Sequence, residues 1–165
     1  MKLNERTYKE RKPGTMPEGA RRAAETVRRV ELPFMGSAVM AGFPSPAEQY
    51  VERPLDLNEL LVARPAATYF VRAEGDSMEG VGIRSGDMLV VDRSLEPWDR
   101  SVVIACVDGE FTVKTFRKGW GGMRLEAANP AYKPIRFKDE MELRGFGVVT
   151  AVIHRFHAAG EQASA

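Results

Sequence analysis

Cysteine is nearly absent from this 165-residue chain, and long apolar stretches are missing altogether. The one cysteine, Cys106, excludes an internal disulfide and indicates a reducing compartment; within an apolar stretch we expect it to be a small core residue. No run reaches the roughly 18 apolar residues of a membrane-spanning helix, and the charged N-terminus lacks the apolar region of a signal peptide. These absences predict a cytoplasmic protein that is not bound to a membrane.

Two residues that are present indicate nucleophilic chemistry. Ser77 lies in residues 75–78 (GDSM), and Lys114 ends residues 111–114 (FTVK). A serine hydroxyl is a poor nucleophile at neutral pH and needs a neighbour that takes its proton. A lysine amine does this only when desolvation lowers its pKa and keeps it neutral. The pair therefore predicts a Ser/Lys protease dyad.

The sequence around Lys114 predicts a β-hairpin that would desolvate its amine. Residues 102–107 and 110–116 have the pattern of two strands, joined by the two-residue turn Asp108-Gly109. This turn places Lys114 opposite Val103, as the only charge inside an otherwise apolar hairpin. Most strand lysines are solvated, however, so the spacing of serine and lysine alone does not establish a dyad.

A third element, residues 39–43 (VMAGF), favours the catalytic interpretation. The small residues Ala41 and Gly42 let the backbone approach a nucleophile closely, while Val39 and Phe43 can fill shallow apolar pockets. The segment has the character of a substrate carried on the enzyme's own chain. Without the dyad, a hydrophobic linker strand with a glycine bend would be the preferred interpretation.

In this order, the three elements resemble the UmuD/LexA family of self-cleaving Ser/Lys (S24-type) proteins of the bacterial SOS response, and its UmuD branch most closely. The similarity runs from about Val39 to about Ile153. The matching segments are residues 42–47 (GFPSPA), 56–58 (DLN), 67–71 (ATYFV), 75–78 (GDSM), 86–87 (GD), 107–114 (VDGEFTVK) and 147–149 (GVV).

The resemblance implies a fold and a set of site residues. The fold would be mainly β, a LexA-like catalytic domain of short bent strands with one short helix. Ser77 would be the nucleophile, Lys114 the general base and Ala41-Gly42 the scissile bond of a serine endopeptidase that acts mainly on itself. The backbone amides of Ser77 and Met78 would stabilise the oxyanion. No cofactor or metal is implied.

The same resemblance implies partners and a cellular role. RecA filaments on single-stranded DNA would stimulate cleavage, and the processed chain would form a homodimer. That homodimer would join a UmuC-like polymerase in translesion DNA synthesis. Because a tethered substrate has a high effective concentration, control would come from how often the segment docks in the cleft.

These assignments divide the chain into three parts. Residues 1–41 would be a flexible basic tail removed by self-cleavage, residues 42–157 the peptidase domain, and residues 158–165 a disordered tail. Residues 1–41 carry nine Lys/Arg and five Asp/Glu, net +4, whereas residues 42–165 carry fifteen and eighteen, net −3. We expect the basic tail to be solvated, with a weak helix over Ala20 to Val30, and too short for a helix-turn-helix. Direct DNA binding is therefore not expected.

Two features depart from the family pattern. The stretch before Ala41 is longer than the tail of UmuD proteins and shorter than the DNA-binding domain of LexA repressors. Arg100-Ser101 stands where the family usually has Gly-Asp. We therefore expect the turn ahead of the hairpin to start earlier, at residues 97–99.

The remaining sequence predicts one short helix and several short strands. Asp56 and Glu59 resemble a capping box that opens a helix through Ala63, closed by Pro65. The leucines of this helix are expected to face the core: Leu57, Leu60 and Leu61. Strands are expected over residues 68–72, 87–92, 102–107, 110–116, 123–127 and 145–156.

Three polar residues are expected to have structural roles only. His154 and His157 fall on opposite faces of the last predicted strand and cannot easily share a metal. Asp76 is expected to cap neighbouring amides in its turn and not to take part in catalysis.

Two other functions stay open at this point. The chain could be a non-enzymatic module whose uncut tail regulates a polymerase or RecA, or a truncated LexA-like repressor that binds DNA through its basic tail. Cleavage at Ala41-Gly42 distinguishes the protease from the module. Salt-dependent binding to duplex DNA tests the repressor.

Overall fold

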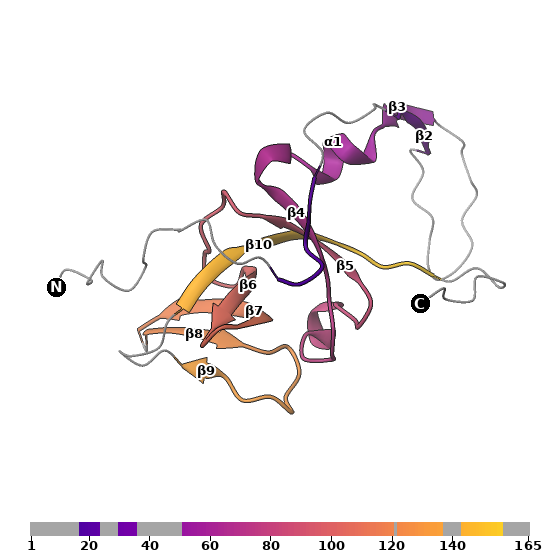
Figure 1. Cartoon of the computed structure of the whole chain (residues 1–165). Coiled ribbons are helices and arrows are strands. Elements are labelled where there is room, and N and C mark those ends of the chain that lie inside the picture. The colour runs from indigo at the N-terminus through magenta and orange to yellow at the C-terminus, as the bar shows by residue number, and fades with distance from the viewer. Residues whose placement is uncertain (1–16, 24–29, 36–50, 121, 137–142, 157–165) are drawn as a thin grey trace.

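The computed structural model describes residues 17–23, 30–35, 51–120, 122–136 and 143–156. Its elements, in chain order, are β1 (Arg21–Arg22), β2 (Leu32–Met35), β3 (Val51–Leu55), α1 (Leu57–Leu61), the 3₁₀ helix Pro65–Ala67, β4 (Thr68–Arg72), the 3₁₀ helix Glu79–Val81, β5 (Met88–Asp92), β6 (Val102–Val107), β7 (Glu110–Gly119), β8 (Gly122–Glu126), β9 (Ile135–Arg136) and β10 (Leu143–Ile153). The predicted mainly β fold is confirmed (Figure 1). Within the described ranges, no helix has the length and apolar character needed to cross a membrane.

One antiparallel sheet organises the described chain. Its eight strands follow the order β1-β4-β5-β10-β6-β7-β8-β9, and β2 and β3 form a separate two-stranded sheet. The long strand β10 pairs with β5 along one stretch and with β6 along another. Its register shifts between Gly145 and Gly147 and again between Val149 and Ala151, and such irregularities bend a strand. In Figure 1, β2, β3 and α1 lie together at one end, away from β6 to β9.

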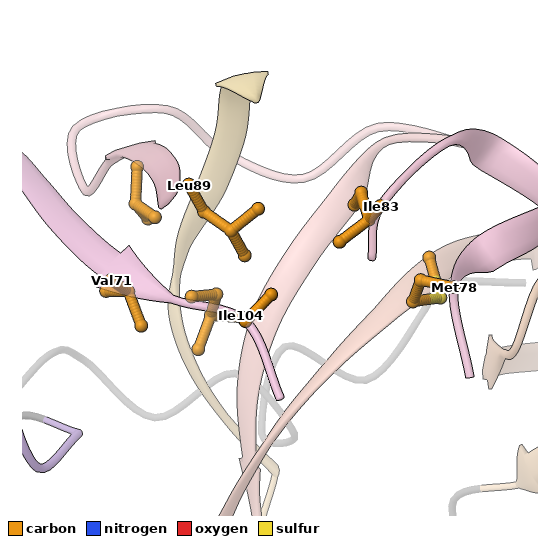
Figure 2. Close-up of a cluster of buried hydrophobic side chains, with 7 residues drawn as sticks. Val71, Met78, Ile83, Leu89 and Ile104 are labelled. Atoms are coloured by element: carbon orange, nitrogen blue, oxygen red, sulfur yellow. The ribbon is translucent and has the colours of Figure 1, made fainter. Parts of the chain in front are cut away.

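The central strand β6 contributes apolar side chains to both faces of the sheet. Ile104 belongs to a cluster that includes Val71, Met78 and Leu89 (Figure 2), while its neighbour Val103 belongs to a second cluster. Successive residues of a strand point to opposite faces, so the alternation along β6 supplies both clusters. A strand buried on both sides gives the hairpin β6–β7 a firm base.

The predicted hairpin is confirmed in its turn and in its register. Asp108 and Gly109 have φ values of 49° and 90°, as a type I′ turn requires. Lys114 pairs with Val103, as the two-residue turn predicts. β7 continues to Gly119, three residues beyond the predicted end at Phe116, because it also pairs with β8.

Helix α1 has the predicted start but not the predicted buried face. Asp56 is its N-cap and accepts a hydrogen bond from the Asn58 backbone amide at 2.8 Å. The prediction that its leucines face the core is wrong for Leu57 and Leu60, which are 52% and 61% exposed, whereas Leu61 is half-buried. The helix has only five residues and ends at Leu61. None of its residues is buried, and it is held to the rest of the fold by its buried N-cap, Asp56.

The predicted helix over residues 20–30 is wrong at Arg21 and Arg22, which form strand β1. They pair antiparallel with Phe70 and Tyr69 of β4, and the next residue, Ala23, is buried. The edge of β4 offers backbone partners, which a short, weakly apolar helix in water would not have. Residues 24–29 and the expected disordered tail, residues 158–165, lie outside the described residues.

A left-handed residue stands ahead of the hairpin. The turn begins at Trp98, whose carbonyl accepts a hydrogen bond from the Ser101 amide at 3.0 Å, as expected from the earlier start. Arg100 has a φ of 72°, a conformation that favours glycine. An arginine therefore carries backbone strain in this turn.

Replacing Arg100 tests this strain. A side chain with a Cβ costs roughly 1–2 kcal/mol in the left-handed region, and glycine loses part of that gain through its greater freedom in the unfolded chain. We expect Arg100→Gly to have a free energy of unfolding about 0.5–1 kcal/mol above that of Arg100→Ala. Urea unfolding of the two variants measures the difference. Greater stability of the alanine variant, the ordinary result at an exposed site, would contradict the assignment.

Candidate active site

Ser77 lies in a tight turn between β4 and the 3₁₀ helix Glu79–Val81. Gly75 opens this turn with a φ of 85°, a conformation that side chains with a Cβ rarely adopt. Met78 is 3% exposed and packs into the core cluster that contains Ile83 (Figure 2). The buried methionine fixes the backbone next to Ser77, whose own side chain is half-buried.

The structure brings Lys114 to Ser77 across 37 residues of sequence. The Lys114 Nζ atom lies 2.9 Å from the Ser77 Oγ atom. It lies at the same distance from the Thr112 Oγ1 atom and from the Val113 carbonyl oxygen. The lysine is 7% exposed, and no ion pair among the described residues includes it.

Burial without a counter-ion controls the protonation of this amine. Desolvation penalises the charged form and lowers the pKa of Lys114 below its ordinary value. A protonated ammonium would donate to all three oxygens. A neutral amine has two N–H donors and one lone pair, so it can donate to Thr112 and Val113 while it accepts from the Ser77 hydroxyl. The three contacts therefore fit either protonation state, and burial without a counter-ion favours the neutral one.

A cleft of about 210 Å³ opens beside Ser77. Its lining combines apolar side chains, among them Val71, Ile104 and Phe111, with polar ones such as Arg72 and Glu74. Side chains from the core cluster of Figure 2 form part of the lining. Pro17 also lines the cleft, which brings the N-terminal segment to the same place. An extended peptide with apolar side chains fits such a surface.

The backbone amides of Ser77 and Met78 donate to no carbonyl in the described part of the chain. Their carbonyls, in contrast, accept hydrogen bonds: that of Ser77 from the Ala128 amide at 2.9 Å, and that of Met78 from the Val81 amide at 3.2 Å. The turn is thus held through its acceptors. Its two amides stay available for an oxygen atom from elsewhere.

Three residues of the site were not singled out in the sequence. Thr112 contacts the lysine, and Asn129 and Tyr132 contact Asp76 beside the serine. Thr112 could have been found by its position two residues before Lys114 on the same strand face. Asn129 precedes a proline, which indicates a turn but does not show that the turn contacts Asp76.

The other predicted residues have different surroundings. The prediction that Asp76 caps neighbouring amides is wrong, since its carboxylate accepts hydrogen bonds from the Tyr132 hydroxyl and from the Asn129 side chain at 3.3 Å. His154 Nδ1 lies 2.6 Å from the Asp87 carboxylate. A hydrogen bond from the Arg84 backbone amide, followed by the histidine, lowers the pKa of Asp87. His157 and the segment 39–43, with Ala41 and Gly42, lie outside the described residues.

Comparison with known proteins gives matches along most of the chain. Residues 33–150 match the family model described as Peptidase S24-like. Protein SamA of Salmonella typhimurium is 49% identical over 123 residues, which are 74% of this chain and 85% of that protein. Protein ImpA of Escherichia coli is 46% identical over 131 residues, 74% of this chain and 83% of that protein. A LexA repressor of Shewanella piezotolerans is 38% identical over 125 residues, 74% of this chain and 59% of the repressor.

The lowered pKa of Lys114 predicts how stability depends on pH. Between the folded and unfolded pKa values, the unfolded chain binds a proton that the folded chain does not, so stability rises with pH up to the unfolded value of about 10.4. We expect the free energy of unfolding of Ser77→Ala to rise from neutral to alkaline pH relative to that of Ser77→Ala/Lys114→Met. Urea unfolding at both pH values measures it, and other titrating groups cancel in the comparison. A constant difference would contradict a lowered pKa.

Proposed function

Because the chain belongs to the Peptidase S24-like family, we propose that it is a self-cleaving serine peptidase in which Ser77 and Lys114 cut the chain's own Ala41-Gly42 bond. The matches to SamA, ImpA and a LexA repressor confirm the resemblance to the UmuD/LexA family. The observation that carries the proposal is the 2.9 Å contact between the Ser77 hydroxyl and a buried lysine. A surface lysine would be protonated and could not act as a base.

Lys114 acts as the general base in the first step. Its neutral amine accepts the Ser77 hydroxyl proton while the Oγ atom attacks the carbonyl carbon of Ala41. The two remaining N–H groups stay hydrogen-bonded to Thr112 and Val113, so the lone pair is directed at the serine. The resulting ammonium then gives its proton to the Gly42 nitrogen, and the Ala41-Gly42 bond breaks.

The oxyanion formed on Ala41 accepts hydrogen bonds from the amides of Ser77 and Met78. This assignment is supported by the turn, in which both amides are free of described backbone partners. Donors fixed before the reaction stabilise the developing charge without rearranging. Lys114, again neutral, removes a proton from a water molecule, and hydrolysis of the acyl-serine releases the new carboxylate at Ala41 and restores the Ser77 hydroxyl.

The substrate segment belongs to the connection between two paired strands. β2 ends at Met35 and β3 begins at Val51, and the two strands pair antiparallel, so residues 36–50 start and finish at neighbouring places. Such a tether gives the segment a high effective concentration at the cleft. Val39 and Phe43 supply the apolar side chains that the cleft beside Ser77 would bind.

The cleavage serves the bacterial SOS response to DNA damage, in line with the UmuD/LexA relationship. RecA filaments on single-stranded DNA stimulate it by favouring the docked state of the segment. The fragment 1–41 is removed, and residues 42–157 act as the domain of a homodimer. That homodimer is an accessory subunit of a UmuC-like translesion polymerase, and it works in the cytoplasm.

Cleavage at one bond is the first expected outcome. Incubation of the purified chain should give a 41-residue fragment and a fragment of 165 − 41 = 124 residues. Mass spectrometry identifies both, and parallel samples with RecA filaments should form them faster. Gly42→Trp should block the cut because a large side chain prevents close approach of the backbone to Ser77.

Two controls separate the parts of this proposal. Ser77→Ala should stay intact with and without RecA filaments. Fragments that end at any other bond would show that Ala41-Gly42 is not the substrate. An unchanged rate with RecA filaments would leave the peptidase assignment standing and contradict the RecA-dependent regulation.

Alkaline activation is the second expected outcome. Because burial lowers the pKa of Lys114, the fraction of neutral amine grows as pH rises and reaches its limit once pH exceeds that pKa. We expect the rate of spontaneous cleavage to rise from neutral to alkaline pH and then level off. Gel densitometry over a pH series measures it, with circular dichroism as the check on folding. A flat profile in a folded chain would exclude Lys114 as the base.

A further inference from the structure

The connection between β8 and β9 contains a turn, residues 128–132 (ANPAY), which we call the brace turn. The Tyr132 amide donates to the Asn129 carbonyl at 3.1 Å. The Ala131 amide donates to the Asn129 side chain at 3.0 Å. Pro130 occupies the second position, where its fixed φ suits the turn. The brace turn is therefore stiffened by its own sequence.

The brace turn contacts the Ser77 turn through backbone and side chains. The Ala128 amide donates to the Ser77 carbonyl at 2.9 Å, and the Ala128 carbonyl accepts from the Gly80 amide at 3.0 Å. The Asn129 side chain donates to the backbone carbonyl and to the carboxylate of Asp76, both at 3.3 Å. The Tyr132 hydroxyl donates to the other carboxylate oxygen of Asp76. Asp76 and Ser77 are thus hydrogen-bonded to the brace turn, and Met78 is buried in the core.

The two backbones meet without space between them. A Cβ atom added at Gly80 would lie 2.1 Å from the Ala128 carbonyl oxygen, closer than any real contact. Met78 is buried just before this point. A shift of the brace turn would therefore move the backbone of the Ser77 turn with it.

The position of the Ser77 Oγ atom and that of the Lys114 Nζ atom depend on different parts of the fold. Thr112 and Val113 of β7 hold the amine. The brace turn holds the serine backbone. The 2.9 Å contact between the two atoms exists only while both parts stay in place. Proton transfer is sensitive to such geometry, because a shift of about 1 Å can cost up to about a hundredfold in rate.

The Tyr132–Asp76 hydrogen bond is the exposed link of this system. Tyr132 is 44% exposed and Asp76 is exposed, so water can replace the bond and its loss affects global stability little. We infer that Tyr132, acting through Asp76, is a positioning residue for the nucleophile Ser77. The inference rests on the proposed self-cleavage. In it, Asp76 is the residue beside the serine that accepts the hydrogen bonds of the brace turn.

A double-mutant cycle on the full-length chain tests the inference. Spontaneous self-cleavage is measured at alkaline pH for wild type, Tyr132→Phe, Asp76→Ala and the double variant. We expect each single change to slow cleavage about tenfold. The double variant should be no slower than Asp76→Ala, because that change already removes the tyrosine link, together with the carboxylate contact of Asn129. Asp76→Asn keeps an oxygen acceptor for the tyrosine but loses the one for the Asn129 side chain, so it should cleave faster than Asp76→Ala.

Further readouts separate positioning from a merely structural role. The melting temperatures of all variants should stay near that of wild type, and Lys133→Ala, next to Tyr132 on the same connection, should leave rate and melting temperature unchanged. The pH midpoint of cleavage should also stay unchanged while the plateau falls, because the base is intact and only the geometry is altered.

Several results would overturn the inference. Wild-type cleavage by Tyr132→Phe would show that the bond does not position Ser77, while the proposed function would stand. A loss of rate with a matching loss of melting temperature would assign Tyr132 to stability alone. Multiplied losses in the double variant would mean that the two residues act separately. A wild-type chain that did not cleave itself would contradict the proposed function and the positioning role together.

Discussion

The arrangement of this molecule depends on keeping one lysine amine out of water beside a serine. Burial of Lys114 disfavours its charge, and the oxygens around it fit an uncharged amine. Such a group costs stability unless its hydrogen bonds are satisfied. Thr112 and the Val113 carbonyl satisfy them, which leaves the lone pair for Ser77. The fold around the pair buries the lysine on one side and leaves an open cleft beside the serine on the other.

The sheet supplies both conditions through its central strand. β6 is apolar toward both faces and pairs with β7, so the lysine of β7 is carried on a strand that cannot easily separate from the core. β8 pairs with β7 only as far as Thr115, and the chain then leaves to contact the Ser77 turn. The connection between β8 and β9 thus joins the serine to the rest of the site.

Local sequence predicts the features whose cause is local. The turn Asp108-Gly109 fixes the hairpin register, and Asp56 marks the start of α1. The burial of Leu57 and Leu60 was predicted wrongly. It depends on which other elements pack against the helix, and the spacing of leucines does not reveal them. β1 was missed because its partner is the free edge of β4, about 50 residues away. The contact of Tyr132 with Asp76, 56 residues apart, is likewise set by packing.

The two strands that precede the proposed scissile bond determine what cleavage releases. β1 is bound to β4, β2 is bound to β3, and the Val30 amide donates to Asp56 at 3.0 Å. All three contacts are intramolecular while residues 41 and 42 are joined. After hydrolysis they hold a separate peptide, whose residence obeys mass action and is shortened by dilution. Bond breakage and exposure of the β4 edge then become two events with separate rates.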